Sequence, residues 1–593
     1  MSDSSAENDR SGLGRQGRTP ILDPRRGDME NDHSATKQRS LLSIFGSLIA
    51  EISLPKLLLA WMVSILLPAV LLGLAPLVLT AWVGKSWNRL GEATGAGIVL
   101  VVLVSLSVAW LGWRPLFRVA EKNFWSLNAL AVQPGYAFWR EAMRHLIERS
   151  LKGQTSADLA RLRAASCAAA GLLLFVVATA VALAAWPFTH WVGSVADLMS
   201  PRLLVIWTIA NAILVMSGYL AAAALVWGFA EAAGDQPLDL KAFDEPMGDA
   251  RVWRIAHLSD VHAVGERYGF RIESGRAGPR GNDRLVRAME RLAALHSTEP
   301  LDLVLVSGDM TDAGLCAEWA EFLDIVAAYP ALAERMLILP GNHDVNIVDR
   351  ANPARLDLPL SPVKTLRKMR ALSAIAAIAG DRVHVLGALS EPPGPALADA
   401  LEPRRREMEH FADSGGTRRS ARLAKLWNDS FPLILPPAGE NGFGVALLDS
   451  NADANFSFTN ALGMISVEQA RRLTASLDAY PRAGWIIALH HHLAEYPAPV
   501  EAFSERIGTA LINGAWFLRV LRPYAARLVV MHGHRHIDWI GRCGELKLIS
   551  APSPVMVRPD EATHFHVHSL AAAPDGSMRL FASQRVDVDP VTS

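Results

Sequence analysis

Cysteine is scarce in this sequence. Its three cysteines, Cys167, Cys316 and Cys543, are widely spaced and include no Cys-x-x-Cys pair. Neither a disulfide framework nor a thiolate zinc site is therefore predicted, and a reducing compartment is the simpler expectation.

Net charge is also nearly absent. The 58 lysines and arginines almost balance the 59 aspartates and glutamates, which leaves a formal net charge of -1. Because attraction to a nucleic-acid polymer needs a strong positive field, we expect no such partner.

The beginning of the chain has few apolar side chains. Over about the first 40 residues, Ser, Arg, Asp and Gly prevail, and such a segment cannot bury enough surface to offset the entropy of ordering. Residues 1–54 are predicted to be a disordered cytoplasmic tail. They lack the apolar stretch and small-residue cleavage site of a secretory signal peptide.

Apolar residues are abundant elsewhere and are concentrated before residue 232. A chain of 593 residues exceeds the roughly 250–300 residues of a single core, so at least two units are expected. Four apolar runs are long enough for bilayer-crossing helices, which need about 20 residues each. The runs are Leu57–Val83, Gly95–Trp113, Cys167–Thr189 and Leu203–Ala230. Residues 55–231 are therefore predicted to be an α-helical transmembrane bundle, with buried helices of a soluble protein as the alternative.

Basic side chains predict the orientation of this bundle. Between the second and third runs, residues 114–163 are rich in arginine and lysine, whereas the other two connections hold only Lys85, Arg89 and Arg202. Because Lys and Arg stay on the cytoplasmic side, we expect both termini in the cytoplasm of a bacterial inner membrane. The stretch Phe138–Leu151 has near-helical apolar spacing, which indicates an interfacial helix or a helix packed on the bundle or the soluble domain.

Residues 232–250 are predicted to be a linker to a second domain over residues 251–593. There, short apolar runs alternate with helical stretches, which indicates layered α/β architecture. The predicted strands are Trp253–Leu258, Leu303–Ser307, Met336–Leu339, Val445–Leu448, Trp485–Leu489, Leu528–Met531 and Leu546–Ile549.

Polar motifs follow five of these strands. They are Asp260-Val261-His262, Gly308-Asp309, Gly341-Asn342-His343-Asp344, His490-His491-His492 and Gly533-His534-Arg535-His536. Alternate side chains of an extended chain point the same way, so Asp260 and His262 are expected to converge. Singly, each motif is explained by a turn; together they indicate a metal site. Mixed oxygen and imidazole ligands suit Mn, Fe or Zn better than Mg or Ca.

In this order, the motifs resemble those of the calcineurin-like metallophosphoesterases. The resemblance extends over most of residues 251–593 and looks closest to the bacterial class III cyclic-nucleotide phosphodiesterases. That finer similarity rests on Ser307–Asp312, Leu489–His491 and Gly463–Gln469.

The resemblance implies a four-layer α/β/β/α sandwich and two divalent metal ions. One ion would be held by Asp260, His262, Asp309 and His536, and the other by Asp309, Asn342, His490 and His534. The choice of His490 over His491 assumes that the ligand is the first histidine after the strand. Two such cations, about 3.5–4 Å apart, activate a bridging hydroxide for in-line attack on phosphorus.

By the same resemblance, His343 would protonate the leaving alkoxide or stabilise the phosphorane-like charge, and Asp344 would orient it. A structural role for His343 beside the ligands is the alternative.

Two stretches exceed a minimal domain of this kind. The arginine-rich segment Arg267–Arg284 could bind a phosphate or be a solvated loop. The insertion Asp349–Phe431 could be a lid, could touch anionic lipid, or could form a solvated helix face, the last being favoured.

The leading hypothesis is a membrane-anchored cytoplasmic phosphodiesterase whose phosphate-ester substrate is a cyclic nucleotide or a similar diester. Its membrane part, without acidic residues in the spans, is interpreted as an anchor in the lipid bilayer. A second hypothesis is a hydrolase of a lipid-linked phosphate or pyrophosphate, which resembles the UDP-diacylglucosamine pyrophosphohydrolases. A third is a non-catalytic metal-binding receptor or scaffold.

Overall fold

The computed structural model describes residues 19–30, 62, 66–90, 103, 107, 133–150, 156–245 and most of 251–588. Gaps in the last range are 267, 273–279, 350–354, 356, 358–360, 387–392, 440–441, 454–456, 498–508, 510, 557–561 and 574. The chain divides into two compact units. The described part of one is the helices before residue 237, and that of the other is residues 19–30 with the chain from Pro237 on.

The helical unit contains two helices that are long and apolar enough to cross a membrane. These spans are Ala160–Phe188 and Pro201–Ala232, and a shorter apolar helix covers Ala69–Lys85. Its elements are α3 (Leu67–Leu90), α5 (Gln133–Ser150), α6 (Ser156–Ala185), η5 (Trp186–Phe188), α7 (Val195–Leu198) and α8 (Pro201–Ala232). The run Gly95–Trp113 lies almost wholly outside the described residues, so the bundle of four spans stays a prediction.

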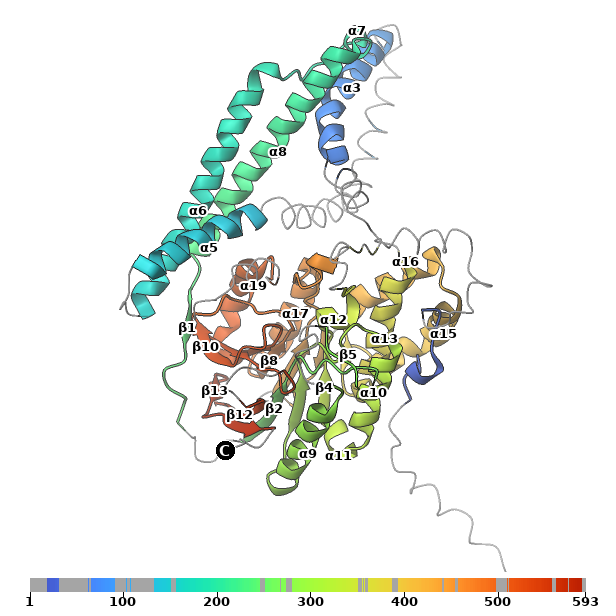
Figure 1. The fold of residues 1–593 in the computed structure, drawn as a ribbon, viewed down its shortest axis with the longest axis vertical. Coiled ribbons are helices and arrows are strands. Elements are labelled where there is room, and N and C mark those ends of the chain that lie inside the picture. The colour runs from blue at the N-terminus through green and yellow to red at the C-terminus, as the bar shows by residue number, and fades with distance from the viewer. Residues whose placement is uncertain are drawn as a thin grey trace, which may run out of the picture. The chain divides into compact units, whose positions relative to one another are not determined.

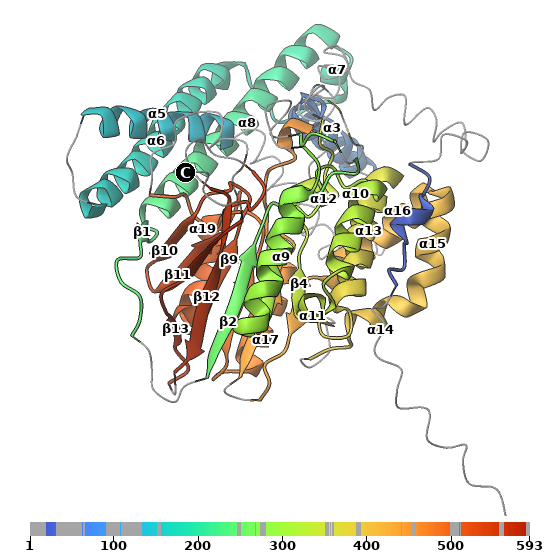
Figure 2. The same ribbon diagram turned by 60° about the horizontal axis from the view of Figure 1, so that its bottom comes forward.

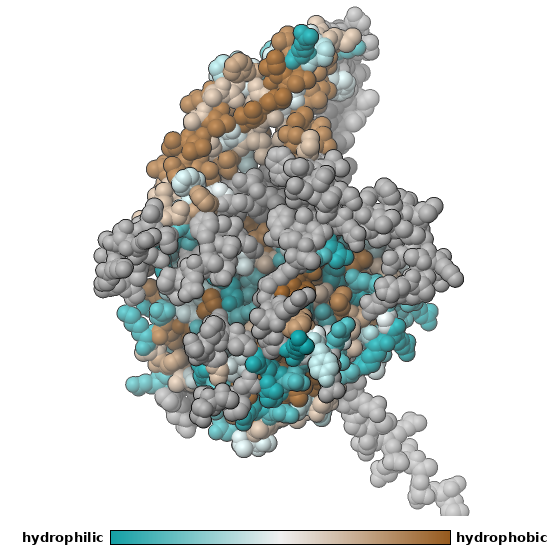
Figure 3. All heavy atoms as spheres, in the orientation of Figure 1, coloured by the Kyte–Doolittle hydropathy of each residue, from teal (hydrophilic) through white to brown (hydrophobic). Residues whose placement is uncertain are grey.

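Small residues let α6 and α8 approach closely. A Cβ atom on Gly171 of α6 would lie 2.6 Å from the Ala224 carbonyl oxygen and 2.9 Å from the Gly228 Cα atom of α8. The outer faces are apolar, with Leu183 and Val226 each 68% exposed, and apolar side chains cover this face of both helices (Figure 3). Close small-residue contacts with apolar outer faces are typical of helices packed in lipid.

The helix α5 has its charged face inside. Arg140 and Arg144 are buried, and the Arg140 guanidinium lies 3.0 Å from the Glu231 carboxylate of α8. Phe138 and Trp139 are instead 47% and 41% exposed. Charges satisfied within the helical unit and aromatic rings left outside agree with the predicted interfacial helix, which remains a prediction.

The second unit is built on two mixed sheets (Figures 1 and 2). One sheet has the order β1 (Pro237–Asp239), β10 (Trp539–Cys543), β11 (Leu546–Ser550), β9 (Leu528–His532), β8 (Gly484–Ala488), β7 (Phe443–Leu447), β6 (Leu433–Leu435) and β5 (His384–Val385). The other has the order β13 (Met578–Leu580), β12 (His564–Ala572), β2 (Val252–Leu258), β3 (Leu303–Val306) and β4 (Met336–Ile338), with β14 (Gln584–Asp587) paired to β12. All seven predicted strands coincide with strands of these sheets.

Apolar side chains at successive positions of a strand pack on opposite faces of its sheet, and helices cover the outer faces. Along β8, Ile486 belongs to the core shared with the second sheet, whereas Trp485 and Ile487 belong to a second core on the outer face. That outer core includes side chains of α17 (Val467–Ala479) and α19 (Gly514–Leu521). The shared core includes side chains of α9 (Asp283–Thr298), α10 (Cys316–Ala327) and α13 (Pro362–Ala379). Helices therefore flank the two sheets on both sides, as predicted for an α/β phosphoesterase domain.

Part of the predicted disordered tail is ordered. Residues 19–30, including η1 (Pro24–Arg26), pack on the second unit, with Met29 buried in its core. The Arg370 guanidinium of α13 lies 2.6 Å from the Asp28 carboxylate and 2.7 Å from that of Glu30. The prediction is corrected for these residues, because partners such as Arg370 lie more than three hundred positions away and local composition does not reveal them.

The predicted linker and insertion also contain regular structure. Within residues 232–250, β1 pairs with β10 and extends the larger sheet. The insertion forms α13, α14 (Leu397–Leu401), η7 (Glu402–Arg404), α15 (Arg405–Ser414) and α16 (Thr417–Ser430). The helix α13 is mostly buried, whereas Arg422 of α16 is exposed and pairs with Glu407 at 2.8 Å. The favoured prediction of a solvated helix face therefore suits α15 and α16 but not α13.

The remaining short elements are α11 (Pro330–Ala333), α12 (Asn342–Val345), η8 (Ser457–Thr459) and η9 (Arg522–Arg527). Of these, α12 begins inside the third polar motif.

Candidate metal centre

The first two polar motifs meet where the parallel strands β2 and β3 end. The backbone N–H of Asp260 donates to the Gly308 carbonyl oxygen at 3.0 Å. The N–H of His262 donates to the Asp309 carbonyl oxygen at 2.9 Å. These bonds hold the two loops together and bring their side chains to one point.

Backbone strain is concentrated in these motifs. Among the described residues, the non-glycine residues with positive φ are Asp260, His262, Asp309, His534 and His536, at 55°, 41°, 52°, 76° and 54°. All five are predicted site residues. Residues with a Cβ atom disfavour the left-handed backbone conformation. Five such residues in one site therefore point to a functional constraint.

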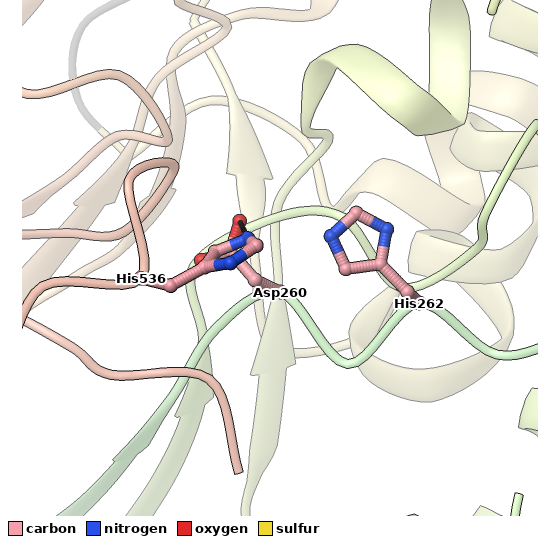
Figure 4. A group of neighbouring side chains, drawn as sticks. All are labelled: Asp260, His262 and His536. Carbon is pink, nitrogen blue, oxygen red and sulfur yellow. Dashed lines mark ion pairs between the residues drawn. The ribbon is translucent and has the colours of Figure 1, made fainter. Parts of the chain in front are cut away.

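One group of side chains consists of Asp260, His262 and His536 (Figure 4). The Nε2 atom of His536 lies 3.3 Å from Oδ1 of Asp260, and Nε2 of His262 lies 3.8 Å from Oδ2 of Asp309. Both ring nitrogens of His262 and Oδ1 of Asp260 are buried without a hydrogen-bond partner.

A second group surrounds Nε2 of His490. That atom lies 3.2 Å from Oδ2 of Asp309, 3.1 Å from Oδ1 of Asn342 and 3.2 Å from Nδ1 of His534. Asp309 thus stands between the two groups, and Nε2 of His534 is buried without a hydrogen-bond partner.

The hydrogen positions on the His490 ring test whether these side chains could bind a cation. Nδ1 of His490 lies 2.9 Å from the Ser307 carbonyl oxygen, which can only accept, so Nδ1 carries a hydrogen. In the neutral ring, Nε2 then presents a lone pair to the oxygens of Asp309 and Asn342, which also present lone pairs. Either a second proton on the ring or a cation among these atoms resolves the repulsion, and the mixed oxygen and imidazole donors suit a cation.

The pKa shifts of Asp309 and His490 agree with a site that binds positive charge. Burial alone would raise the pKa of Asp309, but the imidazoles of His490 and His343 lower it well below its usual range. Burial also opposes charge on His490, yet Asp309 raises the pKa of that imidazole to about 9.

Glycines in the motifs permit the close approach of these loops. A Cβ atom on Gly341 would overlap the Asp309 carboxylate and backbone nitrogen. One on Gly533 would overlap the Ser259 hydroxyl and the Asp260 carboxylate. The backbone can reach the carboxylates only without a side chain at these positions.

The ring of His343 borders the first group. It lies edge-on to His262, with 4.5 Å between ring centroids, and its backbone N–H donates to Oδ1 of Asp309 at 2.8 Å. Its Nδ1 atom lies 2.6 Å from the Asp312 carbonyl oxygen. These contacts fix the orientation of the ring beside the first group.

That Asp344 orients His343 stays a prediction, whereas the structure shows the donors that its carboxylate binds. Its carboxylate accepts hydrogen bonds from the backbone N–H groups of Thr311 and Gly341, at 2.9 and 2.8 Å, and from the Thr311 hydroxyl at 2.7 Å. It therefore ties the second motif to the third, while the Asp312 carbonyl orients His343. Burial and the nearby Asp309 raise the pKa of Asp344 to about 6.

Two residues near the centre were not assigned from the sequence. Asp312 ends the motif that begins at Gly308, and its Oδ1 atom lies 3.5 Å from Nδ1 of His262. The Ser450 hydroxyl accepts the backbone N–H of His490 at 3.1 Å and bonds Nδ1 of His491 at 2.9 Å. The position of Asp312 at the end of the stretch Ser307–Asp312 could have indicated its place near the centre. No sequence motif marks Ser450 in this way.

The arginine-rich segment after the first motif is only partly described. Arg271 is buried, and burial lowers the pKa of its guanidinium to about 10 while Asp312 opposes that shift. Residues 273–279 lie outside the described part, so contact of this segment with a phosphate stays a prediction.

Comparison with known proteins agrees with this geometry. A family model described as calcineurin-like phosphoesterase matches residues 254–538. No curated protein matches the sequence. A dimetal phosphatase from Danio rerio is 14% identical, with 57% of this chain and 99% of that chain covered and a TM-score of 0.32.

Two other solved structures share about half of their length with this chain. The 5'-nucleotidase precursor of Thermus thermophilus is 13% identical, covers 57% of this chain and 54% of its own, and has a TM-score of 0.29. The purple acid phosphatase PPD1 of yellow lupin is 11% identical, covers 58% and 55%, and has a TM-score of 0.27.

Proposed function

Because residues 254–538 are a calcineurin-like phosphoesterase domain, a family of metal-dependent phosphoric ester hydrolases, we propose that this protein is a membrane-anchored phosphodiesterase with a dinuclear metal centre. The observation that carries the proposal is the convergence of lone pairs around Nε2 of His490. A histidine whose other nitrogen is tied to a carbonyl is oriented for metal binding.

The proposed ligands are those that the structure brings together. One ion takes Asp260, His262, Asp309 and His536, and the other takes Asp309, Asn342, His490 and His534. When bound, two such cations activate water for attack on phosphorus and neutralise the charge that develops there. Mn, Fe or Zn suits this donor set.

His343 supplies the proton in this proposal. Its Nδ1 hydrogen is committed to the Asp312 carbonyl, so a second proton at Nε2 is the one it can give to the departing oxygen. Asp344 positions the loops that carry Asp309 and Asn342, and it does not touch the reacting atoms.

A diester, with a cyclic nucleotide as the leading example, is the proposed substrate, on the resemblance of the motifs to class III phosphodiesterases. The apolar faces of α6 and α8 keep a second candidate open, a lipid-linked phosphate or pyrophosphate. We favour an enzyme over the non-catalytic alternative, because every ligand position that the family resemblance implies is filled in this sequence.

Contact of the amino-terminal segment with the catalytic domain supports the proposed topology. Residues 19–30 pack on the domain that begins at Pro237, so both lie on the same side of any membrane. The chain between them must then cross an even number of times, which agrees with either two or four spans. With the basic residues 114–163 kept inside, that side is the cytoplasm.

The experiment that tests the function uses the full-length protein in detergent. Hydrolysis of bis(p-nitrophenyl) phosphate and p-nitrophenyl phosphate is measured with added Mn, for the wild type, for Asp309→Asn and for Asp413→Asn. Asp413 is an exposed carboxylate of α15 and serves as the matched control.

We expect diester cleavage by the wild type and the control, and its loss in Asp309→Asn. Activity that depends on added lipid-linked substrate would support the second candidate. Bound metal without turnover of any ester would contradict the proposal.

A further inference from the structure

A second set of metal-ligating side chains lies outside the centre described above. His564 and His566 are alternate residues of β12, so both point to the same face of its sheet. Figure 2 shows β12 beside β2 in that sheet. Asp538 follows β9 and the motif that ends at His536. The Nε2 atoms of both histidines lie 2.9 Å from the same oxygen, Oδ2 of Asp538.

The hydrogen positions in this cluster resemble those around His490. Nδ1 of His564 lies 3.0 Å from the carbonyl oxygen of Ala562 and therefore carries a hydrogen. In the neutral ring, its Nε2 lone pair faces a carboxylate oxygen at hydrogen-bond distance. That arrangement needs either a second proton on the ring or a cation between the two groups.

The burial of the cluster suits a bound ion. The side chains of His564 and His566 are 3% and 13% exposed, and that of Asp538 is 28% exposed. Nδ1 of His566 is buried without a hydrogen-bond partner. The imidazoles are thus the more buried donors, and the Asp538 carboxylate is the most exposed of the three side chains.

We propose that Asp538, His564 and His566 form a third cation site, separate from the dinuclear centre, that takes zinc or a similar borderline divalent ion. Two imidazole nitrogens and one carboxylate leave a fourth position for water in a tetrahedral set. None of the three residues is a proposed ligand of the dinuclear centre, and the site does not depend on the proposed activity.

The ion would join two distant parts of the chain. Asp538 is two residues after His536, and β12 begins 26 residues later. A cation there ties the segment after His536 to the middle of a sheet. Its role is therefore to fix the loop that carries His534 and His536, and no contact with the substrate is required.

The alternative is an ion pair without metal, in which His564 is an imidazolium and His566 donates from Nε2. Both arrangements keep the same atoms together, so they are distinguished by metal content. The full-length protein in detergent is stripped with a chelator, loaded with zinc, desalted, and its metal counted by mass spectrometry.

The variants are chosen to remove one donor at a time. His564→Gln and Asp538→Asn should each bind one ion fewer per chain than the wild type. His568→Gln is the matched control, because His568 lies on the same face of β12 but bonds the Ser583 hydroxyl at 2.7 Å. The control should keep the wild-type count.

The double variant Asp309→Asn/His490→Gln tests whether the third site binds metal without the dinuclear centre. With the dinuclear centre disabled, one zinc ion per chain should remain bound, and Co in its place should give the intense visible spectrum of a tetrahedral ion. Loss of all tightly bound metal in this folded double variant would overturn the proposal. A wild-type count that saturates at two ions would also overturn it, whether or not the single variants fold.

Discussion

The amide oxygen of Asn342 lies 3.1 Å from Nε2 of His490, although that nitrogen has no hydrogen to donate in the neutral ring. The Ser307 carbonyl holds the only ring hydrogen on the opposite side. Two acceptors kept this close indicate a place for a cation, and the neighbouring histidine offers a control for that conclusion.

His490→Gln should reduce diester hydrolysis more than about a hundred-fold, since the loss of a ligand exceeds the 10–100-fold effect of an outer-shell change. His491→Gln should stay within that smaller range, because His491 bonds Ser450, which in turn accepts the N–H of His490. Steady-state kinetics with metal counts would decide. Equal losses in both variants would contradict the choice of His490.

Gly341→Ala should abolish most of the activity without changing any ligand. The added Cβ atom would overlap the Asp309 carboxylate, so that the loop or the carboxylate must move. We expect weaker metal binding, measured by competition with a chelator. Gly218→Ala in α8 is the control, as a Cβ there meets nothing within 4 Å. Unchanged metal affinity in Gly341→Ala would show that the loop adjusts freely.

His534→Gly and His534→Ala should differ in stability although both remove the same ligand. The φ angle of 76° at this position suits glycine, and a left-handed residue with a Cβ costs roughly 1–2 kcal/mol. In the metal-free protein, the glycine variant should therefore melt at the higher temperature. Identical melting temperatures would mean that the loop relaxes once the imidazole is removed.

Lys364 should make stability depend on alkaline pH. Burial lowers its pKa to about 8, and Asp453 opposes the shift. The folded state gives up this proton at a lower pH than the unfolded state, so the free energy of unfolding rises between about pH 8 and the ordinary lysine pKa near 10.4. Below pH 8, Lys364→Met should stabilise the protein by about 3 kcal/mol, at about 1.4 kcal/mol per pKa unit.

Melting temperatures from pH 7 to pH 10 would test this, with the exposed Lys425→Met as control. The Asp453 carboxylate also lies 3.1 Å from Nζ of Lys368, so it retains a charged partner when Lys364 is replaced. A melting temperature that falls with the substitution at pH 7 would show that the ion pair outweighs the cost of burial.

The segment 19–30 should be part of the folded catalytic domain. Arg370→Gln leaves the Asp28 and Glu30 carboxylates without their partner, and breaking a buried ion pair costs about 3–5 kcal/mol. The variant should melt at a lower temperature, and limited proteolysis should cut near Asp28. Arg404→Gln, at an exposed arginine of η7, should change neither, and the same result for Arg370→Gln would argue against the contact.

The sequence by itself determined the strands of the catalytic domain and the motifs at their ends. Apolar runs such as Leu528–Met531 bury both faces of a strand wherever they lie, so their pattern is local and visible. It also predicted the clusters around Asp260 and Asp309, because parallel strands deliver their ends to one edge of a sheet. The number of membrane spans and the ligand roles remain predictions.

Only the tertiary structure decided what depends on distant partners. The Ser307 carbonyl orients His490, and the backbone N–H groups of Thr311 and Gly341 bind the Asp344 carboxylate. The strand β12 was not predicted, although Phe565 and Val567 alternate with histidines in the two-residue period of a strand. Asp28 pairs with Arg370 of α13, and the backbone N–H of Met29 donates to the Ala412 carbonyl oxygen of α15; both partners lie more than three hundred positions away. Such contacts are decided by packing and charge pairing in three dimensions, which no local window of sequence records.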